Sequence, residues 1–212
     1  MRQDRLSDAA DLLEMVERSQ PSATALSTLG LIQFRLGRYQ QAIDSYTRAI
    51  DRDSTLAAPR EGLGFLLYMT GDLEGARRTV EDALKRWSAN FYLPYLHGLI
   101  LWRMSHRFGS EAMSAIAASL QQNPRFAPAY FLRGKIRLGV NDIGGALADF
   151  QQASRLDPNY ALPWYKMAQI YYREGRSEEG KEAERRFIAL GSLREEEVLA
   201  KEAQDALAPV AK

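Results

Sequence analysis

The chain has 212 residues, of which 46% are hydrophobic and 26% charged, and this globular composition argues against wholesale disorder. Its 28 lysines and arginines balance 27 aspartates and glutamates, so no basic excess indicates a nucleic-acid partner. The absence of cysteine excludes disulfides, a thiolate nucleophile and cysteine-ligated zinc, and only His97 and His106 supply imidazoles. The composition favours a binding protein over an enzyme and predicts no cofactor and no metal site.

The sequence shows no secretory signal and no membrane-spanning segment. Residues Met1–Arg5 are mostly charged or polar, and the longest uncharged apolar run, Phe91–Trp102, contains Pro94 and is only twelve residues long. We therefore expect no membrane insertion. The lack of cysteine suits a reducing cytoplasm, but it also suits an exported protein whose signal has been removed, so the compartment stays open.

The first predicted element is a helix within residues 1–22. Ala9, Leu13 and Val16 are spaced as one face of a helix, and Pro21 follows them. Because the same pattern returns later in the chain, residues 3–19 are interpreted either as half of a repeat or as an N-terminal cap.

From residue 23 onward the sequence repeats itself about every 34 residues. Gly30, Gly64, Gly98 and Gly134 follow one another at spacings of 34, 34 and 36 residues. A second series with the same interval comprises Ala42, Ala76, Ala112, Ala146 and Gly180. The two series share one insertion of two residues, which we place in the segment 104–110, where a loop would absorb it.

Each repeat is predicted to consist of two helices joined by a tight turn. Apolar residues recur at helical spacing on both sides of a residue that tolerates the left-handed conformation. These turn residues are Gly37, Gly71, Asn141 and Gly175. Two helices approach closely only where a side chain is small, so we expect Gly30 and Ala42 to mark the contact within the first repeat.

A single helical hairpin cannot bury its own apolar faces, so neighbouring hairpins must stack. The predicted fold is all-α, a right-handed α-solenoid of about five helix-turn-helix units without a sheet. The five repeats are expected at residues 23–56, 57–90, 91–126 (with the insertion), 127–160 and 161–191.

The last predicted element is a C-terminal helix within residues 192–212. Ser192 and Glu195 form a capping box, and an apolar stripe runs from Leu199 to Val210. We expect this helix to cap the open edge of the last repeat.

The 34-residue pattern resembles the tetratricopeptide repeat, and the resemblance covers about 170 of the 212 residues. The fourth repeat carries the family's marked residues at Tyr130, Gly134, Ala146, Phe150, Ala153 and Pro158. His97 and Arg133 replace the usual leucine, and Glu184 stands where an apolar residue belongs. We therefore expect the second helix of the fifth repeat to be the least stable.

The resemblance implies a concave face lined by the first helices of the repeats. Carried over residue by residue, the partner-binding groove comprises Phe65, Tyr68, Tyr95, Leu99, Trp102, Arg103, Phe131, Lys135, Tyr165, Gln169, Tyr172 and Arg173. Aromatic residues and arginine dominate binding hot spots. About half of the groove aromatics are expected to pack between helices instead, with Phe131 the first candidate, and the same is expected of the neighbouring Leu138. Ser27 and Leu31 occupy places where some family members clamp a carboxylate, so that specificity is not expected here.

The predicted function is a non-enzymatic scaffold that binds a peptide or helix of a partner protein in this groove. Apolar walls with a few cations suit aromatic or aliphatic anchors accompanied by acidic groups. One alternative is a structural module that self-assembles, or joins a larger complex, through its ends or convex face. Another is a sensor that holds a small ligand between Trp102 and the loop at 104–110. We expect His97 in the core, His106 in solvent and no catalytic residue.

Overall fold

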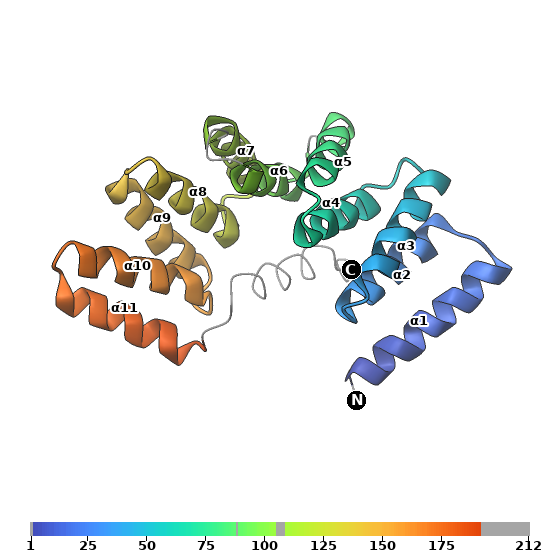
Figure 1. The fold of residues 1–212 in the computed structure, drawn as a ribbon, viewed down its shortest axis with the longest axis horizontal. Coiled ribbons are helices and arrows are strands. Elements are labelled where there is room, and N and C mark those ends of the chain that lie inside the picture. Colours follow the sequence, from blue (N-terminus) through green and yellow to red (C-terminus); the bar gives the residue numbers. More distant parts are fainter. Residues whose placement is uncertain (1, 88, 105–108, 192–212) are drawn as a thin grey trace. The chain divides into compact units, whose positions relative to one another are not determined.

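The computed structural model describes residues 2–87, 89–104 and 109–191, with the side chains of residues 2–4 left aside. These residues contain eleven α-helices and no strand (Figure 1). In chain order the helices are α1 (Arg2–Ser19), α2 (Ala23–Arg35), α3 (Tyr39–Arg52), α4 (Ala58–Thr70), α5 (Leu73–Arg86), α6 (Tyr92–Met104), α7 (Gly109–Gln122), α8 (Ala127–Gly139), α9 (Ile143–Leu156), α10 (Ala161–Arg173) and α11 (Ser177–Ala189). The predicted all-α fold is confirmed, while the C-terminal capping helix and His106 lie outside the described residues.

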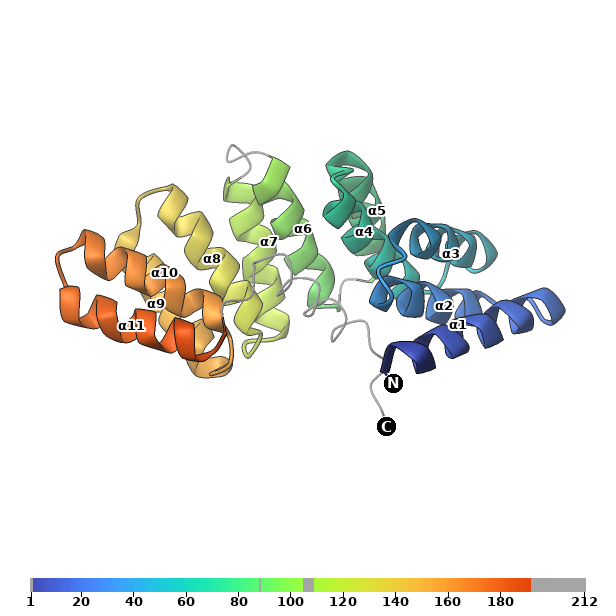
Figure 2. The same cartoon turned by 60° about the horizontal axis from the view of Figure 1, so that its bottom comes forward.

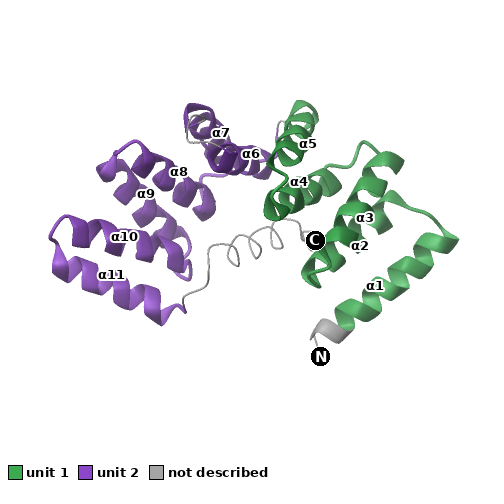
Figure 3. Cartoon of the chain, viewed as in Figure 1, with its two compact units in different colours: residues 1–88, 201–212 green, residues 89–200 purple. Residues whose placement is uncertain are grey.

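The chain divides into two compact units (Figure 3). Unit 1 contains α1 to α5 and unit 2 contains α6 to α11, with the division between residues 88 and 89. Within each unit every helix packs against the next one, and α2 also contacts α4 in unit 1, as α6 contacts α8 in unit 2. We propose that α2/α3, α4/α5, α6/α7, α8/α9 and α10/α11 are repeats 1 to 5, at the boundaries predicted above. No helix of the described chain is both long and apolar enough to cross a bilayer.

The turns within the repeats have the backbone conformation that the sequence predicts. Gly37, Gly71 and Gly175 have φ values of 75°, 92° and 74°, and Asn141 has a φ of 62°. Residues with a Cβ atom rarely adopt this left-handed backbone conformation, and glycine and asparagine tolerate it best. These residues end the first helix of a repeat and reverse the chain into the second.

The small residue in the first helix of a repeat accommodates a large side chain from the second helix. A Cβ atom at Gly30 would lie 2.8 Å from the ring of Tyr46, and one at Gly134 would lie 2.6 Å from the ring of Phe150. The sequence predicts Ala42 as the contact of Gly30, and in repeat 3 the backbone oxygen of the equivalent Ala112 lies 3.1 Å from a Cβ atom placed at Gly98. Ala42 is fully buried, but the atoms nearest to Gly30 belong to Tyr46.

Aromatic side chains join neighbouring repeats inside each unit. In unit 1, Phe34 of α2 meets Phe65 of α4 edge-on, with ring centroids 5.6 Å apart. In unit 2, Phe131 of α8 lies 5.2 Å from Tyr160, which precedes α10. Burying these rings stabilises the stacking that an isolated hairpin could not provide.

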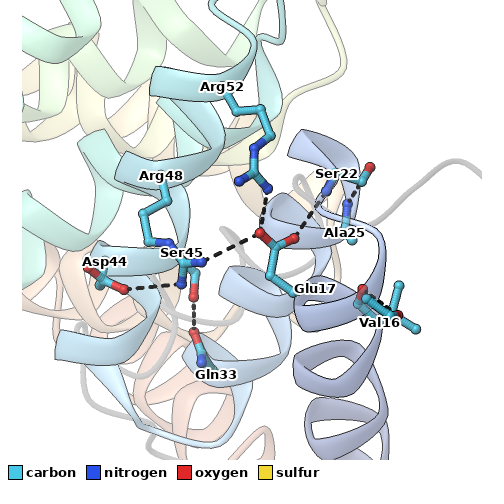
Figure 4. A network of polar contacts seen from close by, with 10 residues as sticks. Val16, Glu17, Ser22, Ala25, Gln33, Asp44, Ser45, Arg48 and Arg52 are labelled. Carbon is cyan, nitrogen blue, oxygen red and sulfur yellow. Dashed lines mark hydrogen bonds and ion pairs between the residues drawn. The ribbon is translucent and has the colours of Figure 1, made fainter.

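Helix α1 is fixed to unit 1 by a carboxylate (Figure 4). Its buried side is centred on Ala10 and Glu17 rather than on the predicted stripe that contains Val16. Glu17 accepts hydrogen bonds from the backbone N–H of Ser22 at 3.1 Å and from Arg52, and Arg48 lies 3.5 Å away. Desolvation raises the pKa of Glu17, but the hydrogen bonds from Ser22 and Arg52 and the charges of both arginines outweigh it and lower the pKa overall.

A buried ion pair explains why repeat 4 departs from the family pattern at Arg133. Asp149 on α9 is 2% exposed and accepts from Arg133 Nη2 at 2.6 Å and from Arg137 Nη1 at 2.9 Å. The two arginines, one turn apart on α8, neutralise a carboxylate that would be costly to bury alone. Arginine therefore replaces an apolar contact with an ionic one at this position.

Candidate functional site

The predicted groove residues lie on the first helices of repeats 2 to 5. Phe65 and Tyr68 lie on α4 in unit 1, and the others lie on α6, α8 and α10 in unit 2. Each unit therefore presents its own part of the predicted face.

Five of the predicted groove residues are buried. They are Phe65, Tyr68, Tyr95, Leu99 and Phe131, each less than 7% exposed. Phe65 packs on Phe34, and the ring of Tyr95 meets that of Phe126 at 4.9 Å in an edge-on arrangement. Phe131 packs in the core of unit 2 as expected, and Leu138 is partly buried against the same core. These side chains hold the helices in place and offer little surface to a partner.

Trp102 is half-buried and packs over the end of α8. A Cβ atom at Gly139 would lie 2.5 Å from its ring, so glycine makes room for the indole at this point. The loop that would close a small-ligand pocket beside Trp102 includes residues 105–108, which lie outside the described residues. The small-ligand alternative therefore stays a prediction.

The exposed members of the predicted groove are concentrated on α10. Gln169 and Arg173 are exposed, and Tyr165 and Tyr172 are 41% and 43% exposed. Both tyrosines lean toward α11. The Tyr165 ring lies 5.2 Å from that of Phe187, and the Tyr172 hydroxyl donates to Glu184 at 2.7 Å, a hydrogen bond that raises the pKa of Tyr172. On α6 Arg103 is also exposed, and Lys135 on α8 is half-buried.

Between the end of α8 and the side of α10 lies a pocket of about 330 Å³ (Figure 2 labels α8, α9 and α10). It is lined by Leu138, Asn141, Ile143, Lys166, Gln169, Ile170, Arg173 and Glu174. The left-handed turn at Asn141 reverses the chain after α8 and brings Ile143, at the start of α9, to the pocket. Leu138, Ile143 and Ile170 supply its apolar surface.

The polar side chains of this pocket carry a positive bias, and two of them are unpartnered within the described residues. Gln169 and Arg173 make no hydrogen bond or ion pair with any residue that the structure describes, and Lys166 is a second cation. The single carboxylate, Glu174, is paired with Arg176 at 3.2 Å. An acidic group would therefore find an unpaired guanidinium and an amide next to apolar contacts.

The side of α10 that lines the pocket overlaps the predicted groove but does not coincide with it. The predicted groove takes Tyr165, Gln169, Tyr172 and Arg173 from α10, whereas the pocket shares Gln169 and Arg173 and has Lys166 in place of the two tyrosines. Both sets have helical spacing, and only the packing of α10 against α11 decides between them. The spacing of Lys166 and Arg173 was visible in the sequence, but the pocket contributions of Asn141 and Ile143 depend on how α8 and α9 meet.

The described residues offer no metal site. They contain no cluster of three histidine, aspartate or glutamate side chains that could hold a metal ion. His97 is half-buried on α6, next to Gly98, where a Cβ atom would lie 2.8 Å from Ile116.

Family models match two segments of the chain. The model described as tetratricopeptide repeat matches residues 23–56, and a second model, described as TPR repeat, matches residues 141–175. These segments coincide with repeat 1 and with the region from the α8–α9 turn to the end of α10. Together with the helical architecture, they show that the chain belongs to the tetratricopeptide repeat proteins.

Curated relatives and solved structures agree with this placement. Superkiller protein 3 of Schizosaccharomyces pombe is 31% identical over 143 residues, which cover 63% of this chain and 10% of that protein. A chain of the APC/C hetero-tetramer Cut9–Hcn1 shares the fold with a TM-score of 0.79 at 16% identity, covering 97% of this chain and 40% of its own. YrrB, described as a TPR protein with an unusual peptide-binding site, has a TM-score of 0.60 at 20% identity, covering 91% and 96%. The chain thus spans only a tenth of the length of the first relative.

Proposed function

We propose that the protein is a non-enzymatic interaction scaffold whose unit 2 binds a peptide or helix of a partner protein. The observation that carries the proposal is the pocket between α8 and α10, where Gln169 and Arg173 have no partner among the described residues and face an apolar surface. The fold supports the proposal because tetratricopeptide repeats are interaction modules, and a solved protein of this fold, YrrB, is described as having a peptide-binding site.

The chemistry of the pocket defines the partner segment. An aliphatic or aromatic side chain would pack against Leu138 and Ile170, while a carboxylate beside it would pair with Arg173 and Lys166. Tyr165, Tyr172, Lys135 and Arg103 would extend the contact along the first helices of unit 2. Affinity typical of such modules is micromolar, about −8 kcal/mol.

The test starts from peptides selected by display against the full chain, with their Kd measured by calorimetry. Arg173→Glu should raise the Kd of acidic peptides at least about tenfold, because it replaces an attraction with a repulsion. Arg155→Glu on α9 is the matched control, since Arg155 is also exposed and the change in net charge is identical. An equal loss of peptide affinity in both variants, or no loss in either, would show that the α8–α10 pocket is not part of the binding site.

A second candidate function is self-association or docking into a larger assembly through α1. Its outward side exposes three neighbouring apolar residues, Leu12 at 62%, Met15 at 64% and Val16 at 44%. Light scattering over a range of concentrations tests this function. Self-association that Leu12→Ser and Met15→Ser abolish, and that Ile188→Ser on α11 leaves intact, would support it, and a monomer at every concentration would contradict self-association.

A further inference from the structure

Tyr46 on α3 extends between α2 and α4 in unit 1. A Cβ atom at Gly30 on α2 would meet its Cδ1 at 2.8 Å, and one at Gly62 on α4 would meet its hydroxyl oxygen at 2.8 Å. The ring therefore runs from α2, at its Cγ end, to α4, at its hydroxyl end. The two glycines leave just enough room for it, and only 1% of Tyr46 is exposed.

The hydroxyl of Tyr46 has no hydrogen-bond partner among the described residues, yet its oxygen is not sealed off. Tyr46 lines a pocket of about 320 Å³ beside the first turns of α2 and α4. Leaving a nearly buried hydroxyl without a partner costs free energy, so such groups are normally satisfied.

Packing does not require this hydroxyl. In repeat 4 the equivalent position holds Phe150, whose fully buried ring lies against Gly134 in the same way that Tyr46 lies against Gly30. A phenylalanine ring therefore fills this space without a hydroxyl. The oxygen of Tyr46 is an addition that no described residue bonds, in a side chain that lines a cavity.

The pocket is neutral and mainly apolar. Besides Tyr46, its walls are formed by residues of α2 and by residues at and just before the start of α4, namely Thr24, Ser27, Thr28 and Leu31, and Leu56, Ala57, Ala58 and Pro59. No lining residue is charged, and the charges of Arg35 and Glu61, which lie outside the lining, act on Tyr46 in opposite directions. A charged group would therefore lose its hydration without gaining a net counter-charge. Burial raises the pKa of Tyr46 above its ordinary value, which keeps the phenol a hydrogen-bond donor at neutral pH.

We propose that this pocket binds an uncharged apolar residue of a peptide, with a peptide carbonyl beside that residue accepting a hydrogen bond from the Tyr46 hydroxyl. The volume lies at the lower end of the range for ligand pockets and suits one large side chain rather than a cofactor. The site lies in unit 1 and shares no residue with the α8–α10 pocket of unit 2, so either site can fail in experiment without the other.

N-acetyl-leucinamide is the probe, because it combines an aliphatic side chain with two neutral carbonyls. N-acetyl-leucine, which carries a charged carboxylate, is its matched comparison. In a titration of the 15N-labelled full chain, the amide probe should shift the resonances of α2 and of the first turn of α4, and the carboxylate should bind more weakly. Equal binding of both probes, or no shift in this region, would overturn the proposal.

Tyr46→Phe separates a binding role from a structural one. The substitution should raise the Kd of the amide probe about fivefold to tenfold, which corresponds to the loss of one hydrogen bond. It should leave Tm unchanged or raise it, because an unpaired buried hydroxyl is removed. Tyr39→Phe makes the same change at an exposed position of α3 and should alter neither quantity. A lowered Tm with unaltered probe binding would show that the hydroxyl serves the fold, and would contradict the proposal.

Discussion

Glu17 shows how one carboxylate can decide where a helix packs. It lies on the last turn of α1, and the groups that satisfy it come from the start of α2 and the end of α3. Removing the charge takes away the counter-ion of Arg52 and leaves one acceptor oxygen fewer for Arg52 and the Ser22 N–H. The attachment of α1 therefore depends on this side chain as well as on apolar burial.

Glu17→Gln should lower the free energy of unfolding by about 1 kcal/mol at pH 7, as expected for a charge-assisted contact with partly exposed arginines. Because the pKa of Glu17 is lowered in the folded state, its contribution is complete above the ordinary value of 4.5 and is lost as pH falls through the folded-state value. Urea denaturation of both proteins at neutral and acidic pH provides the measurement. A difference between them that persists unchanged in acid would contradict this account.

Individual residues also show what the sequence could and could not predict. Gly37 and Asn141 were identifiable as turn residues, because the backbone conformation that they permit is a local property. The contact between Gly30 and Tyr46 was missed, because a ring four residues beyond Ala42 reaches back across the hairpin. The partnership of Arg133 with Asp149 likewise needs the packed helices, since the two residues are sixteen positions apart.

At the scale of elements, α10 shows why a fold is easier to predict than a binding face. Met167 and Tyr171 lie one helical turn apart on one side of α10, and both are buried. Its remaining surface offered two stripes, and the packing of Tyr165 and Tyr172 toward α11 assigns them to the edge of the repeat rather than to the pocket. A rotation of one residue is too small for periodicity alone to detect.

Helix α11 should be the least protected second helix of unit 2. Of its residues only Gly180 and Ala183 are buried, whereas α9 buries Phe150 and the ion-paired Asp149. Where other repeats place an apolar residue, α11 has Glu184, whose contact is an exposed hydrogen bond to Tyr172. Few buried contacts allow local opening at low cost in free energy.

Hydrogen exchange checks this expectation directly. The amides of α11 should exchange at least about tenfold faster than those of α9, a ratio that corresponds to about 1.4 kcal/mol in opening free energy. Glu184→Leu should slow exchange in α11 by restoring apolar contact with α10. Equal protection of α9 and α11 in the unaltered chain would show that burial does not set their relative stability.

At the scale of the whole molecule, two units built from the same repeat carry different surfaces. Unit 1 presents a neutral pocket with the Tyr46 hydroxyl, and unit 2 presents a pocket with unpaired Arg173. The repeat supplies the scaffold, and residues that the scaffold does not need give each surface its chemistry. Family membership therefore predicts binding in general, while the partner follows from these variable positions.

The most direct test of the central claim is to map where a selected acidic peptide contacts the 15N-labelled full chain by amide chemical shifts. The proposed function predicts changes concentrated on α8 and α10, around Leu138, Gln169 and Arg173, that disappear in Arg173→Glu and persist in Arg155→Glu. Changes confined to α1, or to the outward side of α11, would contradict binding at the α8–α10 pocket and would favour association through the ends of the repeat array.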